Sequence, residues 1–225
     1  MGASAAVLLS GGLDSTVLLH YVAKHLQKVP LYVLSFDYGQ SHSRELEMAR
    51  CQAASLDGVA EHIILDMTFY AQLVSGTSAL VNDGPEVPDL KDLSDEQRRQ
   101  PPTYVPNRNM VLLALGAAFA EARGCRELYY GAQAQDEYGY WDCTTEFVSG
   151  LNRVLDLNRR NPVRICAPFV NMSKSEEIKL GMELGVDFAQ TWTCYRGEER
   201  PCGRCPTCVE RKRAFSAAGL ADPLA

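Results

Sequence analysis

The sequence predicts an α/β fold, with a doubly wound parallel sheet followed by a small four-cysteine region. Short apolar segments alternate with segments of helical periodicity over the first third of the chain, and the alternation resumes after residue 103. Strands that alternate with helices pair in parallel, and right-handed crossovers place the helices on both faces of the sheet. Four cysteines then fall within fifteen residues near the C-terminus.

Each early element has its own signal. Residues 5–9 form a continuous apolar run, which is typical of a strand buried on both faces. Helical spacing of apolar side chains predicts helices over 15–27 and 43–56. Further short apolar runs predict strands at 31–36 and 62–65. The first third therefore reads as strand, helix, strand, helix, strand.

A long loop separates these elements from the second half. Residues 76–103 are rich in glycine, proline and charge, with one helical turn predicted near 94–99. Loops of this length are usually functional lids or disordered. Pro106, Gly124 and the capping box of Ser173 with Glu176 then mark helix ends. The later elements expected are a helix over 106–123, a strand over 127–131, a helix over 145–157, a strand over 163–167 and a helix over 173–185.

Composition favours a globular protein that acts on small molecules. The 225 residues are 46% hydrophobic and 22% charged, which suits one domain or one domain with a small appendage. No apolar run reaches the roughly 18 residues that span a bilayer, and the N-terminus lacks the marks of a secretory signal. The net charge of -6 disfavours nucleic acid. We expect a cytoplasmic protein with no nucleic-acid or membrane partner.

Residues 10–15 read Ser-Gly-Gly-Leu-Asp-Ser and lie between the first strand and the first helix. Ligands bind at the carboxyl ends of strands in open parallel sheets, and N–H groups at a helix start bind anions. Asp14 could reach a Mg²⁺ ion held by phosphates. The alternative is a helix entry that binds nothing. The string also resembles the phosphate loop of the pyrophosphate-loop ATPases. This resemblance implies an ATP site, which we expect to comprise Leu8, Leu9, Ser10, Gly11, Gly12, Leu13, Asp14, Ser15, Thr16, Phe36, Asp37 and Tyr38.

Two cations are candidate catalytic residues. Arg108 lies in the first turn of a helix, where the helix dipole disfavours a cation unless an anion is near. We therefore expect Arg108 to face a phosphate or a carboxylate, with neighbouring Asn109 binding the substrate. Lys174 opens the last predicted helix of the sheet region and could hold the leaving pyrophosphate. An exposed position is the alternative for either cation, and for Asp37 the alternative is a loop cap.

Residues 135–143 combine aromatic and acidic side chains after a predicted strand. Such a set suits a flat, donor-rich heterocycle such as a guanine-type base. We expect Tyr140 to contact the base, and Asp136 or Asp142 to accept hydrogen bonds from it. The alternatives are a loop anchored by its aromatics, with Asp142 capping the next helix. Cys143 is a candidate nucleophile, although a lone cysteine is usually a small apolar core residue.

The clustered cysteines predict a structural zinc site. Cys194, Cys202, Cys205 and Cys208 supply four thiolates, which suit tetrahedral Zn²⁺ and leave no open coordination position. An iron–sulfur cluster or a redox disulfide pair is the alternative. The scattered cysteines Cys51, Cys125 and Cys166 lie in helix or strand patterns, and we expect them in the core.

Taken in order, these motifs resemble the 7-cyano-7-deazaguanine synthase family, whose first motif is that of the pyrophosphate-loop ATPases. The resemblance covers nearly the whole chain. The matching residues are Ser10 to Ser15, Phe36 to Gln40 with His42, Tyr104 to Pro106 with Arg108 and Asn109, Gly139 and Tyr140 with Asp142 and Cys143, Ser173 and Lys174, Thr191 and Trp192 with Cys194 and Tyr195, and Pro201 to Gly203 with Cys205, Cys208 and Arg211.

The resemblance implies a sheet of the adenine-nucleotide α-hydrolase type over residues 1–190, with a zinc-binding region packed on it over 191–225. It implies conversion of 7-carboxy-7-deazaguanine to the nitrile with ammonia and ATP. ATP would adenylate the carboxylate and then the amide, with Mg²⁺ held by Asp14. It also implies a homodimer with one zinc ion per chain.

Several positions depart from the family's usual residues. The family usually has Pro at the position of Trp141, Arg at Thr144, Gly at Asn107, Arg at Ser41, and Thr or Val at Gln135. These changes leave adenylation intact and leave the acceptor open. A relative that stops at the amide, or that passes the activated deazaguanine to another nucleophile, would keep the same motifs. The remaining hypotheses are a tRNA-modifying pyrophosphate-loop enzyme and a non-catalytic zinc-knuckle module.

Overall fold

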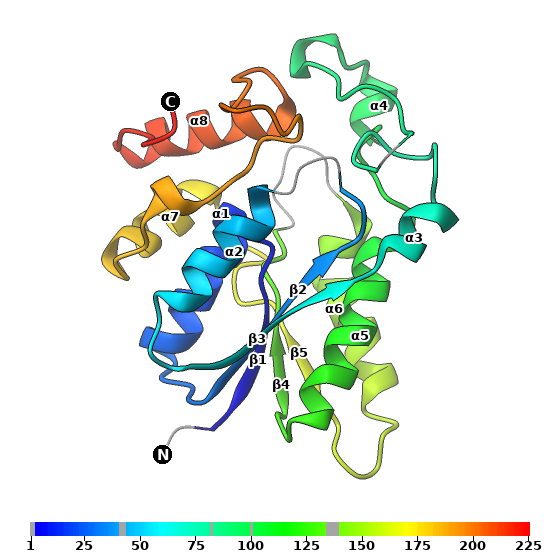
Figure 1. Cartoon of the computed structure of the whole chain (residues 1–225), viewed down its shortest axis with the longest axis vertical. Helices are drawn as coiled ribbons and strands as arrows, with labels where there is room; N and C mark the ends of the chain where they lie inside the picture. Colours follow the sequence, from blue (N-terminus) through cyan, green and yellow to red (C-terminus); the bar gives the residue numbers. More distant parts are fainter. Residues whose placement is uncertain (1–2, 41–43, 82, 100, 134–139) are drawn as a thin grey trace.

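The computed structural model describes residues 3–40, 44–81, 83–99, 101–133 and 140–225. Five strands form one sheet in the order β3-β2-β1-β4-β5, and all neighbours pair in parallel. The predicted doubly wound α/β fold is confirmed (Figure 1). The strands are β1 (Ala5–Leu8), β2 (Leu31–Asp37), β3 (Val59–Asp66), β4 (Glu127–Tyr129) and β5 (Arg164–Cys166).

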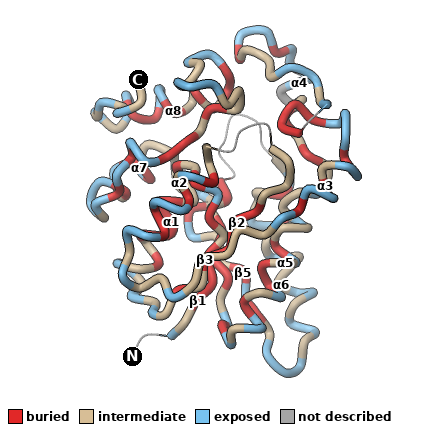
Figure 2. The backbone as a smooth tube through the Cα atoms, in the orientation of Figure 1, coloured by how far each residue is buried: buried red, intermediate tan, exposed pale blue. Residues whose placement is uncertain are grey.

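Helices cover both faces of this sheet because the central strand is apolar on both faces. In β1, Val7 packs in one buried cluster and Ala6 in another, as the period of two requires. Figure 2 shows the buried positions concentrated where these helices meet the strands. One face carries α1 (Leu13–His20), α2 (Arg44–Ala54), α7 (Lys174–Glu183) and α8 (Pro206–Ala218), and the other carries α5 (Arg108–Ala122) and α6 (Thr145–Leu155).

The structure differs from the predicted elements at several helical segments. The helix expected over 15–27 is α1 followed by a π-helical segment, Tyr21–His25. Three α-helical or 3₁₀ segments were not expected: α3 (Thr68–Leu73), Trp141–Cys143 and Phe188–Gln190. Helix α8 was also not expected. Pro206 is the first residue of α8, a position where proline is favoured because no N–H donor is needed.

The described part of the long loop packs on the C-terminal region. It forms a 3₁₀ turn, Leu90–Asp92, and the short helix α4 (Asp95–Arg99), close to the predicted turn. Asp89 lies 2.6 Å from Nη2 of Arg196 and 3.5 Å from Nε of Arg204. The loop is therefore fastened to the segment that carries the cysteines.

Helix α8 joins that region to the main core. Phe215 is buried in the same cluster as Val7 of β1. Arg211 is also buried, and its guanidinium donates to both carboxylate oxygens of Asp222 at 2.9 and 3.1 Å. Among the described residues, no helix has the length and apolarity needed to span a membrane.

Candidate functional site

A cavity of about 250 Å³ opens where β1, β2 and β4 end. The sheet brings to it most of the residues that the sequence predicts for a site. Those that line it are Leu8, Leu9, Ser10, Gly12, Leu13, Asp14, Ser15, Phe36, Tyr38, Arg108, Asn109, Tyr140 and Lys174. Gly11, Thr16, Asp37 and Asp142 are not among its lining residues. Asp136 lies outside the described residues.

The turn that opens α1 is held by its two serines. The Ser10 and Ser15 hydroxyls lie 3.0 Å apart, and the Gly12 N–H donates to Ser10 Oγ at 3.2 Å. Gly12 is the N-cap and has no side chain, so the first-turn N–H groups of α1 face no capping side chain. Such a helix start binds anions.

Gly11 and Gly12 serve this turn in different ways. Gly11 has φ +88°, and a Cβ there would lie 1.9 Å from the Glu45 carbonyl oxygen of α2. Gly12 has φ -72°, and a Cβ there would lie 3.2 Å from Ser10 Oγ at the cavity wall. Gly11 thus permits packing against α2, whereas Gly12 leaves room for a ligand.

We expect Gly11→Ala to lower the free energy of unfolding by about 3 kcal/mol or more, because it combines a left-handed backbone with overlap on α2. Gly12→Ala should stay within about 1 kcal/mol of the wild type and instead weaken nucleotide binding. Urea unfolding of both variants, with calorimetric titration of an ATP analogue, checks the pair. Equal stability of the two variants would contradict this assignment.

Three charged side chains meet on one side of the cavity. Lys174 Nζ lies 2.8 Å from Glu210 Oε2 and 3.6 Å from Asp14 Oδ2. Lys174 is the first residue of α7, whose capping box with Ser173 forms as predicted. The alternative for Lys174, an exposed side chain that projects freely into solvent, is therefore wrong. Glu210 was not predicted, because it comes from α8.

Arg108 lies on the other side of the cavity, at the first position of α5. Its Nη1 donates to the Tyr38 hydroxyl at 3.2 Å. Burial opposes the charged form, but the oxygens of Tyr38, Tyr195 and Tyr140 raise the pKa of Arg108, so it stays a cation. A guanidinium among tyrosines at a helix N-terminus is a site for an anion.

The residue before Arg108 explains one departure from the family pattern. Asn107 is the N-cap of α5 and has φ +55°, in the left-handed region. Glycine adopts this conformation at no steric cost, and asparagine tolerates it better than other residues. The substitution therefore concerns the backbone and leaves the cavity chemistry intact.

The remaining wall is polar and closely packed. Asn109 Nδ2 lies 3.4 Å from Cys143 Sγ and 3.4 Å from the Asp142 carbonyl oxygen. Tyr140 shares a 2.8 Å hydrogen bond with Thr103 Oγ1. Cys143, Tyr140 and Asn109 all line the cavity, as Arg108 does.

Asp142 lies behind this wall. It is 3% exposed. Burial raises the pKa of its carboxyl, and the Arg108 charge and hydrogen bonds from Asn109 oppose the shift. Thr144 caps α6, through a 3.2 Å hydrogen bond from the Phe147 N–H, so Asp142 does not cap it. Asp142 supports Asn109, and its direct contact with a substrate stays a prediction.

The Asp37 carboxylate caps its own loop, which was the alternative to a contact with the nucleotide. Its Oδ1 accepts a 3.3 Å hydrogen bond from the Gly39 N–H, within its own turn. The neighbouring residues Phe36 and Tyr38 line the cavity. The position after β2 is therefore part of the site, although the Asp37 carboxylate belongs to the turn.

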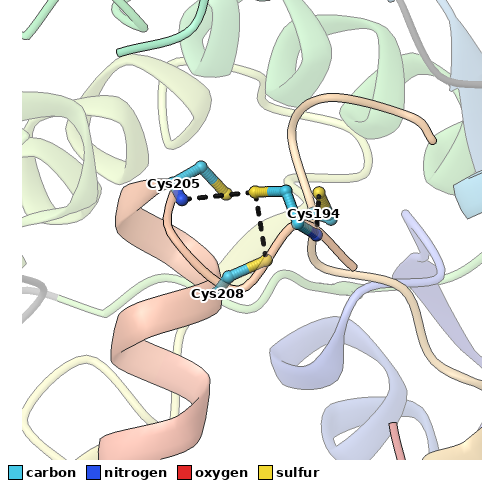
Figure 3. Close-up of side chains that lie close together, drawn as sticks. Cys194, Cys205 and Cys208 are labelled. Atoms are coloured by element: carbon cyan, nitrogen blue, oxygen red, sulfur yellow. Dashed lines mark hydrogen bonds between the residues drawn. The ribbon is translucent and has the colours of Figure 1, made fainter. Parts of the chain in front are cut away.

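The four predicted cysteines converge. The sulfurs of Cys194, Cys205 and Cys208 point toward one another (Figure 3). All four Sγ atoms lie within 4.8 Å of one another. Four thiolates about 2.3 Å from one ion, in a tetrahedron, would have sulfurs about 3.8 Å apart, so the set fits a single metal ion. Hydrogen bonds from the Cys194 and Cys208 thiols lower the pKa of Cys205, which favours a thiolate there.

The other cysteines differ from one another. Cys125 is buried, as expected, and Cys166 is partly buried. Cys51 is exposed on α2, so its prediction as a core residue was wrong. The buried positions of that helix are Leu46, Ala49, Gln52 and Ala53, and Cys51 projects from the opposite side.

Sequence reasoning missed the part of the cavity that the cysteine region supplies. Trp192, Thr193, Tyr195, Thr207 and Glu210 all line it. The Thr207 hydroxyl donates to the Thr193 carbonyl oxygen at 2.8 Å, which ties the start of α8 to the segment before it. The resemblance to a known family already pointed to Trp192 and Tyr195, but not to their place in the cavity.

Some known proteins are similar to this chain in sequence, and others are similar to it in fold alone. A 7-cyano-7-deazaguanine synthase of Clostridium kluyveri is 42% identical over 98% of this chain and 96% of its own length. The NMN synthetase of Francisella tularensis is 16% identical, with a TM-score of 0.56 over 98% of this chain and 79% of that one. The U34-tRNA thiolase NcsA of Methanococcus maripaludis, solved with its [4Fe-4S] cluster, is 14% identical, with a TM-score of 0.52 over 96% and 72%.

The two solved structures establish the fold alone, because their sequences have diverged so far. The sequence relationship is closer and runs the length of the chain. The family model described as "Queuosine biosynthesis protein QueC" matches residues 4–219. This range includes residues 10–15 at the start of α1, Arg108 and all four clustered cysteines. On this evidence the chain belongs to the QueC family.

Proposed function

We propose that this protein converts 7-carboxy-7-deazaguanine and ammonia to 7-cyano-7-deazaguanine, at the expense of ATP. The observation that carries the proposal is that one cavity joins an anion-binding helix start to the half-buried, charged Arg108. The first suits the phosphates of ATP and the second suits a substrate carboxylate. The name of the Clostridium kluyveri relative supports the same reaction.

The first half of the proposed reaction makes an amide. A carboxylate oxygen of the substrate attacks the α-phosphorus of ATP, and pyrophosphate leaves. Ammonia then attacks the acyl carbon, and AMP leaves with the original carboxylate oxygen. Arg108 would orient the carboxylate, and Lys174 with the α1 helix start would receive the negative charge of the pyrophosphate.

The second half removes the remaining oxygen. The amide oxygen attacks a second ATP, pyrophosphate leaves, and loss of the amide protons expels AMP to give the nitrile. The same groups serve both halves because the reacting oxygen occupies the same position each time. Two AMP and two pyrophosphate therefore accompany each nitrile.

The other proposed roles follow from position. Leu8, Leu9, Phe36 and Tyr38 offer apolar and aromatic surface for the adenosine, beside the loop residues that line the cavity. Asn109 and Tyr140 would contact the deazaguanine. Asp136 and Asp142 remain proposed acceptors for its N–H groups.

Two metal ions belong to the proposal. Mg²⁺, which would enter with ATP, screens phosphate charge, and the Asp14 carboxylate at the cavity wall suits it as an oxygen ligand. One structural Zn²⁺ per chain would bind the four cysteines. The short sulfur–sulfur distances favour one ion over a four-iron cluster, in which each thiolate binds a different iron.

We further propose a cytoplasmic homodimer that acts on small molecules. The eight cysteines, which all lie within the described residues, are thiols rather than disulfides, as a reducing compartment requires. The net charge of -6 opposes nucleic-acid binding. The dimer follows from the family resemblance, and analytical ultracentrifugation tests it.

The experiment that tests the function is product analysis. The purified protein, 7-carboxy-7-deazaguanine, ammonium and MgATP are incubated together, and products are followed by mass spectrometry and nucleotide chromatography. We expect the nitrile, with two AMP per nitrile and a transient amide. An amide that accumulates without nitrile would identify the truncated reaction, and AMP release that ignores the deazaguanine would contradict the proposal.

A further inference from the structure

We propose that Glu210 is a positioning residue that holds the Lys174 ammonium beside Asp14, at the phosphate side of the cavity. The inference rests on the proposed function, which assigns Lys174 to the pyrophosphate of ATP. It adds a residue that none of the phosphate-loop or substrate motifs contains. It also gives the cysteine region a part in the reaction beyond stability.

The geometry places the lysine between two carboxylates. Lys174 Nζ lies 2.8 Å from Glu210 and 3.6 Å from Asp14, and the lysine side chain is 11% exposed. A lysine has a flexible four-carbon stem, so its ammonium needs a partner to stay in one position. Lys174 also begins α7, where the helix dipole disfavours a cation. Glu210, the nearer of the two carboxylates, restricts the ammonium to one position and offsets the unfavourable helix dipole.

Helix α8 explains how Glu210 reaches the lysine. Cys205 is the N-cap of α8 and Cys208 lies in its first turn, so the cysteine cluster fixes the helix start. Thr207 and Glu210 are three residues apart and share one helix face, and both line the cavity. The six residues from Cys205 to Glu210 thus carry two cluster cysteines and two groups of the cavity wall.

The position of Glu210 predicts opposite effects on two kinetic constants. A carboxylate at the phosphate side repels ATP, so Glu210→Gln should lower the KM for ATP by about threefold. Without the Glu210 contact the lysine would be misplaced during transfer, so kcat should fall by about tenfold. A residue with a purely structural role would leave KM unchanged and lower kcat only through loss of folded enzyme.

The test compares Glu210→Gln with Glu210→Asp and with Glu183→Gln, which removes an exposed carboxylate of α7. We expect Glu183→Gln to match the wild type and Glu210→Asp to recover most of kcat. In a Lys174→Ala background, Glu210→Gln should cause no further loss, because it acts through the lysine. Thermal unfolding and zinc content verify that each variant is folded, and Glu210→Ala, which also removes the carboxylate, takes the place of Glu210→Gln if the glutamine variant is not.

A kcat for Glu210→Gln within twofold of the wild type, or additive losses with Lys174→Ala, would overturn the proposal. Calorimetric titration with α,β-methylene ATP gives a second readout, in which Glu210→Gln should bind more tightly. If the wild type shows no deazaguanine-dependent turnover, the proposed function fails. The titration then decides on Glu210 by itself, and an unchanged affinity would overturn its placement.

Discussion

Cys205→Ser should abolish binding of the proposed zinc ion and unfold the segment around the cysteines. Trp192 and the cysteines Cys194, Cys205 and Cys208 form a buried cluster separate from the main cores. Because three of its four members are thiols, apolar burial alone contributes little there. Structural zinc contributes folding free energy on the order of 10 kcal/mol in small modules. We expect a loss of several kcal/mol, measured by urea unfolding beside metal analysis of the purified protein.

Cys51→Ser is the matched control, because Cys51 is an exposed thiol on α2. This variant should keep one zinc per chain and the unfolding curve of the wild type. Treatment of the wild type with a chelator should reproduce the Cys205→Ser curve. Iron in the purified protein, or much less than one equivalent of zinc, would contradict the assignment.

The sheet was predictable because each strand is a short apolar run between helical patterns. Helix α8 was not, although it packs on the main core. Its buried positions include Cys208 and Arg211, which do not read as apolar. Arg211 is buried because Asp222 and two threonines accept its hydrogen bonds, and no sequence pattern shows such partners.

Part of the candidate site could likewise be predicted from the sequence, and part could not. Residues 10–15 were predictable because one turn carries all of its ligand-binding groups. The meeting of Asp14, Lys174 and Glu210 was not, because it depends on how three helices pack. The sequence also places Asp37 and Asp142 near strand or helix ends without showing where their carboxylates point. The structure directs the first into its own turn and buries the second.

Asp14 and Asp37 therefore test whether a position at the end of a strand is enough to place a carboxylate in the site. Asp14 follows β1 and Asp37 ends β2, and both were predicted for the ATP site. Asp14 lines the cavity beside Lys174, whereas the Asp37 carboxylate accepts the Gly39 N–H. If position after a strand were sufficient, both substitutions to asparagine would impair the enzyme equally.

We expect Asp14→Asn to lower kcat/KM by about a thousandfold, because a neutral amide replaces the charged carboxylate proposed to bind Mg²⁺ and the ion pair with Lys174 is lost. Asp37→Asn should stay within about tenfold of the wild type, because an amide oxygen can still accept the Gly39 hydrogen bond. Asparagine matches aspartate in size, so both variants should unfold at the wild-type urea concentration. AMP release at varied ATP and deazaguanine concentrations measures the difference. Equal losses in the two variants would mean that Asp37 binds ATP despite its turn, and near-normal turnover of Asp14→Asn would place the phosphates elsewhere.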